Sequence, residues 1–496
     1  MDTQIPKLLD LDYKTPGNAE RQLLDAYHRH IVGQDRALRH LVRDLLVANA
    51  YGGRTCDSTK LRGVFFSFGP TGSGKTYFPE ITALLTLGRM DAFTKIDCSE
   101  LQQSHETARL IGAPQGYVRS EEEPLLSQRR IDWPAFMAQK DNPMLYKEHA
   151  LKGSIEYFQR ALEKNIEKKR AMEAKKETAG AAYEEVKKEG RTLFEAVQRA
   201  REEHKDFMGK HPEVEDIIAE YKPEDGYFSI VLFDEIEKAH LNVHHLLYQI
   251  LDKAQVTHHG SPKYGSPVTR FHNTFMFFSS NIAEEKIQKS AEGKSIGFRP
   301  ARTYTRPELV REAEEERKRI YRIGFDEIKR RFPTPFISRI GKERFYAFSR
   351  PTIFEAREYL DRIIIPRFQK EVGELFLLKL ELTPEARTYL VDESFDKDNR
   401  ILGHRAVLSV FGRRIRQNLM SLLMKTKDEN GVLPGDEVVV DLGKNKEEEN
   451  ELVFKIRERS PEKQKRAEEL SAAIGGKKGR ALKGGRHIAP IPFYGA

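Results

Sequence analysis

Cysteine and long apolar runs are both nearly missing from this sequence of 496 residues. Its two cysteines, Cys56 and Cys98, are too few for a disulfide framework and have no Cys or His partner at metal-ligand spacing, so we interpret both as small apolar side chains. No stretch approaches the roughly 18 consecutive apolar residues that a membrane span needs. The first residues have neither a basic start nor an apolar run of signal length, so we expect a cytoplasmic protein.

A protease centre is also missing from the sequence. The histidines His244, His245, His258 and His259 have no ligand spacing tied to a carboxylate, and no serine, cysteine or zinc constellation is evident. Any proteolysis would therefore need a partner protein.

The hydrophobic content of 39% is ordinary for a globular protein, and the length allows roughly two to four structural units.

The net charge of +8 does not indicate a basic protein as a whole. Residues 455–487 alone carry 11 Lys and Arg against 4 Glu, a net +7, so the rest of the chain is close to neutral. Glycine and basic residues dominate the sequence GGKKGRALKGGRH, a composition that cannot bury a core. We therefore expect a flexible basic tail over 457–496, which would give at most weak, salt-sensitive binding to nucleic acid.

Strands alternate with helices over most of the chain. Helical spacing in 19–30 and 34–50 is followed by strand-like runs at 63–69 (GVFFSFG) and 92–97 (AFTKID), and two more strands are predicted at 227–235 and 273–281. This alternation predicts the α/β class, with a parallel sheet wrapped by helices. We expect an N-terminal extension over 1–24 and a large domain over 25–349.

The segment 127–225 differs from its surroundings and reads as a helical insertion. Apolar residues recur at spacings of three and four within 144–208, which favours two long helices that reverse near 175–182 and pack as an antiparallel coiled-coil hairpin. A single solvated helix is the alternative. After about residue 350, helices with two short strands, LKLELT and DEVVVDLG, predict a smaller α-rich lid domain over 350–456.

A phosphate-binding loop follows the first strand. The sequence GPTGSGKT at 69–76 fits G-x-x-x-x-G-K-[ST], in which backbone N–H groups and a helix N-terminus surround the phosphates of ATP. Lys75 would reach the β- and γ-phosphates, and Thr76 would bind Mg²⁺. The predicted cofactor-binding residues of this loop are Pro70, Thr71, Gly72, Ser73, Gly74, Lys75 and Thr76. A non-binding glycine loop is the alternative.

Polar side chains end the two later strands. In IVLFDE, Asp234 would organise Mg²⁺ and its water, and Glu235 would polarise the water that attacks the γ-phosphate. In FFSSN, Asn281 would hydrogen-bond that water or the γ-phosphate. By itself an apolar strand ending in Asp-Glu is as often structural as catalytic. Together with the loop, it favours ATP hydrolysis.

With these motifs in place, the sequence resembles the AAA+ ATPases and, within them, the C-terminal ATPase module of the Clp protein unfoldases. The segments HRHIVGQDRAL, GPTGSGKT, KIDCSEL, RLIGAPQGYV, IVLFDEIEKAH, HNTFMFFSSN and PFISRI follow in the family's order, and GHRAVLSVFGRRI resembles the start of the second-sensor helix. The resemblance covers roughly 25–120 and 226–445. His404 departs from it, because alanine is expected there.

The resemblance implies further site residues. The adenine would lie against Ile31, Val32, Gly33 and Gln34, and Arg405 would be the second-sensor arginine, unless it is only a surface residue of the lid. Arg339 would be the arginine finger that reaches the γ-phosphate bound to the neighbouring subunit, which implies a homo-oligomer, by family likeness a hexameric ring. Such fingers contribute about 10³ to 10⁵ in rate.

The resemblance also assigns two substrate or partner segments. Tyr117 and Val118 would form a pore loop that grips an extended protein substrate, unless the loop folds back on its own domain. Ile296, Gly297 and Phe298 would dock a ClpP-like peptidase, and a free-standing remodeller is the alternative. The insertion separates the pore loop from the Asp-Glu strand. It would be a docking arm for substrates or adaptors, a passive spacer or a ring contact.

Overall fold

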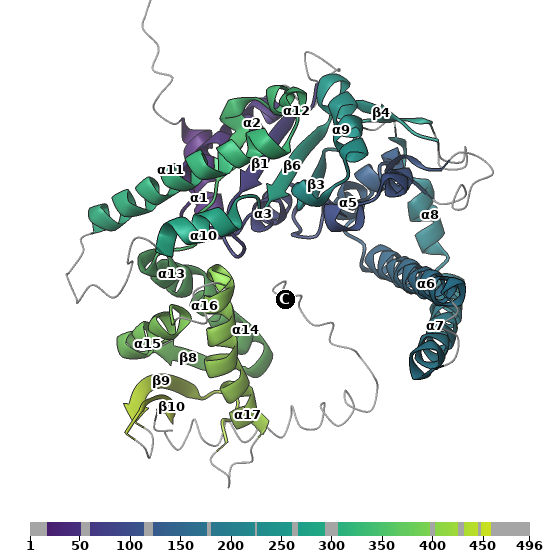
Figure 1. Ribbon diagram of the computed structural model, residues 1–496. Helices are drawn as coiled ribbons and strands as arrows, with labels where there is room; N and C mark the ends of the chain where they lie inside the picture. Colours follow the sequence, from purple (N-terminus) through teal and green to yellow (C-terminus); the bar gives the residue numbers. More distant parts are fainter. Residues whose placement is uncertain are drawn as a thin grey trace, which may run out of the picture.

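The computed structural model describes residues 17–50, 60–113, 123–175, 180–223, 226–259, 266–292, 306–396, 402–424, 431–444 and 448–457. A five-stranded sheet forms its centre (Figure 1). The strands are β1 (Gly63–Phe68), β2 (Thr94–Asp97), β3 (Ser229–Asp234), β6 (Thr274–Ser280) and β7 (Phe345–Ala347). Their order is β2-β3-β6-β1-β7, and every neighbouring pair is parallel. The prediction of a parallel sheet with flanking helices is confirmed.

The register of the sheet brings the ends of three strands together. Phe68 of β1 is paired with Ser280 of β6, and Phe233 of β3 is paired with Phe278. The residues that follow these pairs therefore leave the sheet at the same edge. Ligands of open α/β sheets bind at the carboxyl ends of the strands.

Helices cover both faces of the sheet, and β1, β3 and β6 are buried along almost their whole length. Phe65 and Phe277 contact α1 (Asn18–His28), α2 (Asp35–Ala50) and α3 (Tyr77–Leu87) on one face. Phe66 and Phe278 contact α9 (Leu241–Lys253), α11 (Arg306–Arg331) and α12 (Thr334–Ile340) on the other. Shorter elements complete this part: α4 (Thr107–Ile111), α10 (Glu284–Glu292) and the ribbon of β4 (Gln255–Thr257) with β5 (Val268–Arg270).

In the described part of the chain, four helices lie between α4 and β3 in the sequence: α5 (Gln128–Lys140), α6 (Pro143–Ala174), α7 (Ala181–Lys210) and α8 (Glu213–Ala219). In Figure 1, α6 and α7 lie side by side and extend outward beyond α5 and α8. Asn165 donates to Glu189 at 2.9 Å, and Tyr183 donates to Glu173 at 2.8 Å, so the two helices run antiparallel. Trp133 and Phe136 of α5 anchor the base of the pair in a small apolar cluster.

The C-terminal unit (residues 353–456) has an apolar core of its own. It contains α13 (Ile353–Tyr359), α14 (Ile365–Phe376), α15 (Pro384–Ser394), α16 (His404–Phe411), α17 (Asn418–Met424) and a sheet of β8 (Lys379–Leu382), β9 (Glu437–Lys444) and β10 (Asn450–Ile456). The sequence predicted only two of these strands. The strand that it missed, β10, is an antiparallel edge with only one fully buried apolar residue, Leu452, so its hydrophobic signal is weak.

Candidate nucleotide site

The glycine-rich loop 69–76 connects β1 to α3. Its backbone takes positive φ angles at Gly69 (146°), Gly72 (77°) and Gly74 (91°), which side-chain-bearing residues rarely adopt. A Cβ atom at Gly72 would also collide with the backbone carbonyl of Leu402. Glycine is therefore required here both by backbone conformation and by the close approach of the C-terminal unit.

Lys75 points back into this loop. Its Nζ atom donates to the carbonyl oxygens of Gly69 and Pro70, each at 2.9 Å. Burial lowers the pKa of Lys75 to about 8, while the carboxylates of Glu284, Glu237 and Asp234 act in the opposite direction. At neutral pH the side chain is mostly charged, in a setting where an additional anion would stabilise it.

The polar residues predicted after β3 and β6 lie together. The Asn281 amide donates to Glu235 Oε1 at 2.9 Å, and the Asn281 backbone N–H donates to Glu237 at 3.0 Å. Glu235 has φ of 54° and forms an ion pair with Lys238 at 2.5 Å. The sharp turn at the end of β3 thus directs the two consecutive carboxylates, Asp234 and Glu235, to different partners.

Sequence reasoning missed two partners of Asp234. Lys95 of β2 lies 2.8 Å from its Oδ2 atom, and the Ser279 hydroxyl of β6 donates to its Oδ1 atom. Both residues lie on the strands that flank β3, level with its carboxyl end. Polar residues near the ends of neighbouring parallel strands meet at one sheet edge, so the sequence did contain a signal for these two contacts. Using this signal required the order of the strands in the sheet.

The predicted adenine-side segment is buried between α1 and α2. Ile31, Val32 and Gln34 are each about 95% buried, and Gly33 has φ of 74°. The Gln34 side chain donates to Ser349 O at 3.4 Å. A Cβ atom at Gly33 would collide with Glu355, the first-turn carboxylate of α13. The segment therefore lies where the central sheet and the C-terminal unit meet.

The start of α16 contacts the phosphate loop directly. The backbone N–H of His404 donates to Gly72 O at 3.1 Å. The next residue, Arg405, has its side chain exposed, and its charge lowers the pKa of Lys75, so it lies within electrostatic range of the loop lysine. Arg405 is thus near the candidate site, and His404 is a second residue there that the motif had not assigned.

Arg339 has a different environment. Its guanidinium forms an ion pair with Asp252 at 2.7 Å and lies over the ring of Tyr248, 5.1 Å from the centroid. It also donates to Pro335 O at 3.0 Å. These contacts are to α9 and α12, and none is to residues 69–76 of the same chain. The structure therefore brings the phosphate loop, Asp234, Glu235 and Asn281 together and leaves Arg339 apart.

The remaining predicted site residues lie outside the described residues. These are Tyr117 and Val118 of the predicted pore loop, Ile296, Gly297 and Phe298 of the predicted docking tripeptide, and the basic tail from 458 on.

The residues present fit a nucleotide with its magnesium ion. The Ser73 hydroxyl, inside the loop, is buried and has no hydrogen-bond partner among the described residues. Backbone N–H groups of such a loop, a lysine and a buried hydroxyl are donors suited to phosphate oxygens. Thr76 and Asp234 offer the oxygen ligands that Mg²⁺ prefers.

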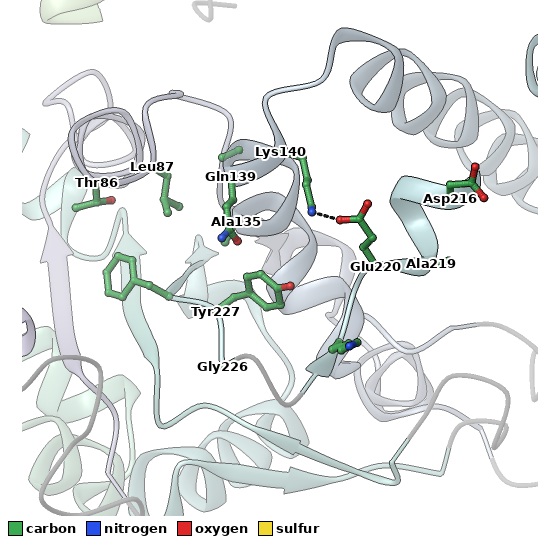
Figure 2. Close-up of a pocket in the computed structure, with 13 residues that line it drawn as sticks. Thr86, Leu87, Ala135, Gln139, Lys140, Asp216, Ala219, Glu220, Gly226 and Tyr227 are labelled. Carbon is green, nitrogen blue, oxygen red and sulfur yellow. Dashed lines mark hydrogen bonds and ion pairs between the residues drawn. The ribbon is translucent and has the colours of Figure 1, made fainter. Parts of the chain in front are cut away.

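A separate cavity of about 990 Å³ lies between the end of α3, α5 and α8 (Figure 2). Leu87, Ala135 and Tyr227 supply apolar walls, and Lys140 and Glu220 form an ion pair at its rim. It contains none of the residues 69–76. The cavity marks the junction of α3 with the inserted helices and is not the candidate nucleotide site.

A parallel sheet with a glycine-rich loop between its first strand and the following helix is the arrangement typical of P-loop nucleotide-binding proteins. Comparison with known families narrows this class: the chain matches the AAA domain of the Cdc48 subfamily at residues 60–133 and 215–342. The two matched segments flank the helices α6 and α7 and contain the phosphate loop, Asp234, Glu235, Asn281 and Arg339.

Curated relatives point to the same group. The chain is 24% identical over 84% of its length to a ClpA homolog, an ATP-binding subunit of the ATP-dependent Clp protease, of Brassica napus chloroplasts. It is 27% identical over 82% of its length to a probable chaperone protein ClpB 1 of Chlorobaculum tepidum, and 22% identical over 84% to the ATP-binding subunit ClpC of Staphylococcus epidermidis. The matched regions cover 34%, 66% and 36% of these proteins, respectively.

The domain match and these relatives show that the chain is similar to the Clp-type AAA+ ATPases. The chain spans about a third of the length of the first relatives that it matches. Among the described residues, no helix has both the length and the apolar character needed to cross a membrane.

Proposed function

We propose that the chain is an ATP-driven protein unfoldase or remodelling chaperone that works as a homo-oligomeric ring. The observation that carries the proposal is the arrangement at one sheet edge. Asn281 holds Glu235 at 2.9 Å, beside a phosphate loop whose lysine is already directed inward. The Clp relatives supply the context of protein handling.

In this proposal each side chain has a distinct task. Lys75 leaves the carbonyls of Gly69 and Pro70 to neutralise the β- and γ-phosphates. Mg²⁺, bound by Thr76 with Asp234, would neutralise charge on the phosphate oxygens. Glu235 accepts a proton from the attacking water, and the Asn281 amide keeps its carboxylate oriented toward that water.

Arg339 would act in trans. Its partners within the chain are Asp252 and Tyr248, and the γ-phosphate that it stabilises would belong to a neighbouring subunit. An ion pair between partly exposed groups contributes only about 0 to 1 kcal/mol to stability, so separating Arg339 from Asp252 costs little free energy. A ring, by family likeness a hexamer, is therefore part of the proposed mechanism.

Force would be applied to protein substrates by Tyr117 and Val118 in a pore loop. An aromatic ring offers a large contact area with little loss of conformational entropy, and it does not select for sequence. The helices α5 to α8, with α6 and α7 as a coiled-coil arm, would present a further docking surface for a substrate or adaptor. The C-terminal unit would act as the lid of the nucleotide site.

Substituting Glu235 tests the catalytic part. We expect Glu235→Gln to bind ATP and keep the oligomer assembled while hydrolysis falls by about 10² to 10⁴, the contribution of a general base. Lys75→Met is the matched control and should lose nucleotide binding itself. ATP hydrolysis at the wild-type rate in Glu235→Gln would refute the assignment of Glu235 as the general base. The trapped complexes of this variant, analysed by mass spectrometry, would show whether the ring handles one protein or many.

Substituting Tyr117 tests the threading part. Tyr117→Ala should still hydrolyse ATP but fail to unfold a tagged globular protein, whereas Tyr117→Phe keeps the ring and should remain active. Unfolding by Tyr117→Ala at an unchanged rate would remove the pore-loop proposal and leave the ATPase proposal intact.

Two partner proposals are narrower. Ile296, Gly297 and Phe298 would dock a ClpP-like peptidase, which pull-down with such a peptidase and an Ile296→Ala variant would test. Alternatively, the chain is a switch that remodels one nucleoprotein complex, favoured by the net charge of the basic tail. DNA binding that disappears with the tail, and that weakens steeply with salt, would support this alternative.

A further inference from the structure

A carboxylate from outside the phosphate loop is bound to the loop. Glu284, the first residue of α10, lies three residues after Asn281. Its Oε1 atom accepts the backbone N–H of Thr71 at 3.0 Å, and its Oε2 atom accepts the Thr71 hydroxyl at 2.9 Å. Backbone and side-chain donors of such loops are the groups that bind anions. Glu284 therefore uses two donors of the candidate phosphate site.

The charges around Glu284 extend from the loop to the connection with the C-terminal unit. Of the carboxylates that act on Lys75, Glu284 has the largest effect on its pKa. On its other side, Arg350 lies 3.4 Å from Glu284 Oε1. Arg350 belongs to the segment that joins β7 to α13. Both side chains are only about a quarter exposed, so solvent screens their charges incompletely.

We propose that Glu284 is an internal anion that competes with nucleotide phosphates for the loop and so sets the affinity of the site. The inference rests on the proposed function, in which residues 69–76 bind ATP. A nucleotide that enters the loop meets either a carboxylate bound to Thr71 or, after displacement, a like charge held nearby by Arg350. In both situations the negative charge of Glu284 weakens phosphate binding.

The alternative role is purely structural. If Glu284 serves as a brace that holds the Thr71 turn in its binding-competent shape, removing the carboxylate would loosen the loop and weaken nucleotide binding. The two roles therefore predict effects of opposite sign. Glu284→Gln separates them well, because the amide oxygen can still accept the Thr71 N–H, the amide NH2 can donate to the Thr71 hydroxyl oxygen, and the charge is removed.

The test measures binding of ADP with Mg²⁺ by isothermal titration calorimetry, on the full chain. We expect Glu284→Gln and Glu284→Ala to bind on the order of tenfold more tightly than wild type at low salt, since a like charge within several Å at an intermediate dielectric is worth about that much. The gain should shrink as salt is added, because the interaction is screened. Glu285→Gln, next to it on α10, should change the affinity less than twofold.

Each outcome is decisive. Unchanged or weaker ADP binding by Glu284→Gln, with the melting temperature of the variant preserved, would overturn the competition and leave the proposed function standing. Equal tightening by Glu285→Gln would also overturn it, because the effect would then come from net charge and not from the contact with Thr71. Failure of the wild-type chain to bind ADP would instead overturn the proposed function itself.

Discussion

Replacing His404 should change how the stability of the protein depends on pH. This imidazole packs edge to face against Tyr359, with ring centroids 4.9 Å apart, and its Nδ1 atom is buried without a hydrogen-bond partner among the described residues. Burial lowers the pKa of His404 to about 4. The Arg317 charge lowers it further, and the Glu355 carboxylate acts in the opposite direction. The folded protein thus holds His404 neutral.

The sign and size of the effect follow from this shift. A histidine whose pKa falls on folding contributes stability that is present above its unfolded pKa of about 6.5 and is lost as the pH falls toward 4. At pH 5 the unfolded chain binds nearly one proton more than the folded chain at this residue, which costs about 2 kcal/mol relative to pH 7. Since His404 is partly exposed, we expect about 1 to 2 kcal/mol.

Urea unfolding at pH 7 and pH 5 is the assay, with His404→Phe as the main variant because it keeps a ring against Tyr359. The difference in unfolding free energy between wild type and variant should shift by about 1 to 2 kcal/mol in favour of the variant at pH 5. Burial raises the pKa of Asp132 to about 6, so this residue changes the unfolding free energy in the opposite direction as the pH falls. Its contribution is the same in wild type and variant and cancels in the difference. Parallel pH dependences would refute the reasoning.

Two further predictions concern the contacts around the loop and the inserted helices. Gly403→Ala should weaken ADP binding, because φ is 59° and an added Cβ atom would lie 2.5 Å from the carbonyl oxygen of Gly72 in the phosphate loop. Gly88→Ala is the control: with φ of 82° and open space around it, this variant should lose only the roughly 1 to 2 kcal/mol of stability that backbone strain costs. Equal ADP affinities in the two variants would contradict the prediction. Arg89→Ala should lower the hydrogen-exchange protection of α6 by about 1 kcal/mol, because the Arg89 guanidinium stacks on the Tyr146 ring, 3.7 Å from its centroid. Asp91→Asn removes the ion pair of Arg89 and keeps the stack, so it should leave this protection unchanged. Equal losses of protection in the two variants would contradict the prediction.

The sequence predicted β1, β2, β3 and β6 of the central sheet, and it missed the edge strand β7, which has only three residues. Runs such as GVFFSF and TFMFFSS are buried along their whole length, and only a strand covered by helices on both faces reads this way. The motifs after these strands then identified Lys75, Asp234, Glu235 and Asn281. Their proximity followed from one rule, that parallel strands end at a common edge.

Other features could not be read from the sequence. Lys95 and Glu284 look like ordinary surface charges, and their partners, Asp234 and Thr71, lie 139 and 213 residues away. The strand β10 escaped because an exposed antiparallel edge leaves little apolar signal. In each of these cases the missing information was which distant segments pack together.

The sequence by itself determined the chemistry: a glycine loop that can take positive φ angles, a lysine and two carboxylates at strand ends, and an asparagine to orient one of them. Residue type and local spacing suffice for this, because each group acts through its own functional atoms. Only the tertiary structure decided the electrostatic setting, in which Glu284 binds Thr71, Lys95 pairs with Asp234 and His404 reaches the loop. Charges separated by long stretches of chain interact only when folding brings them within a few Å.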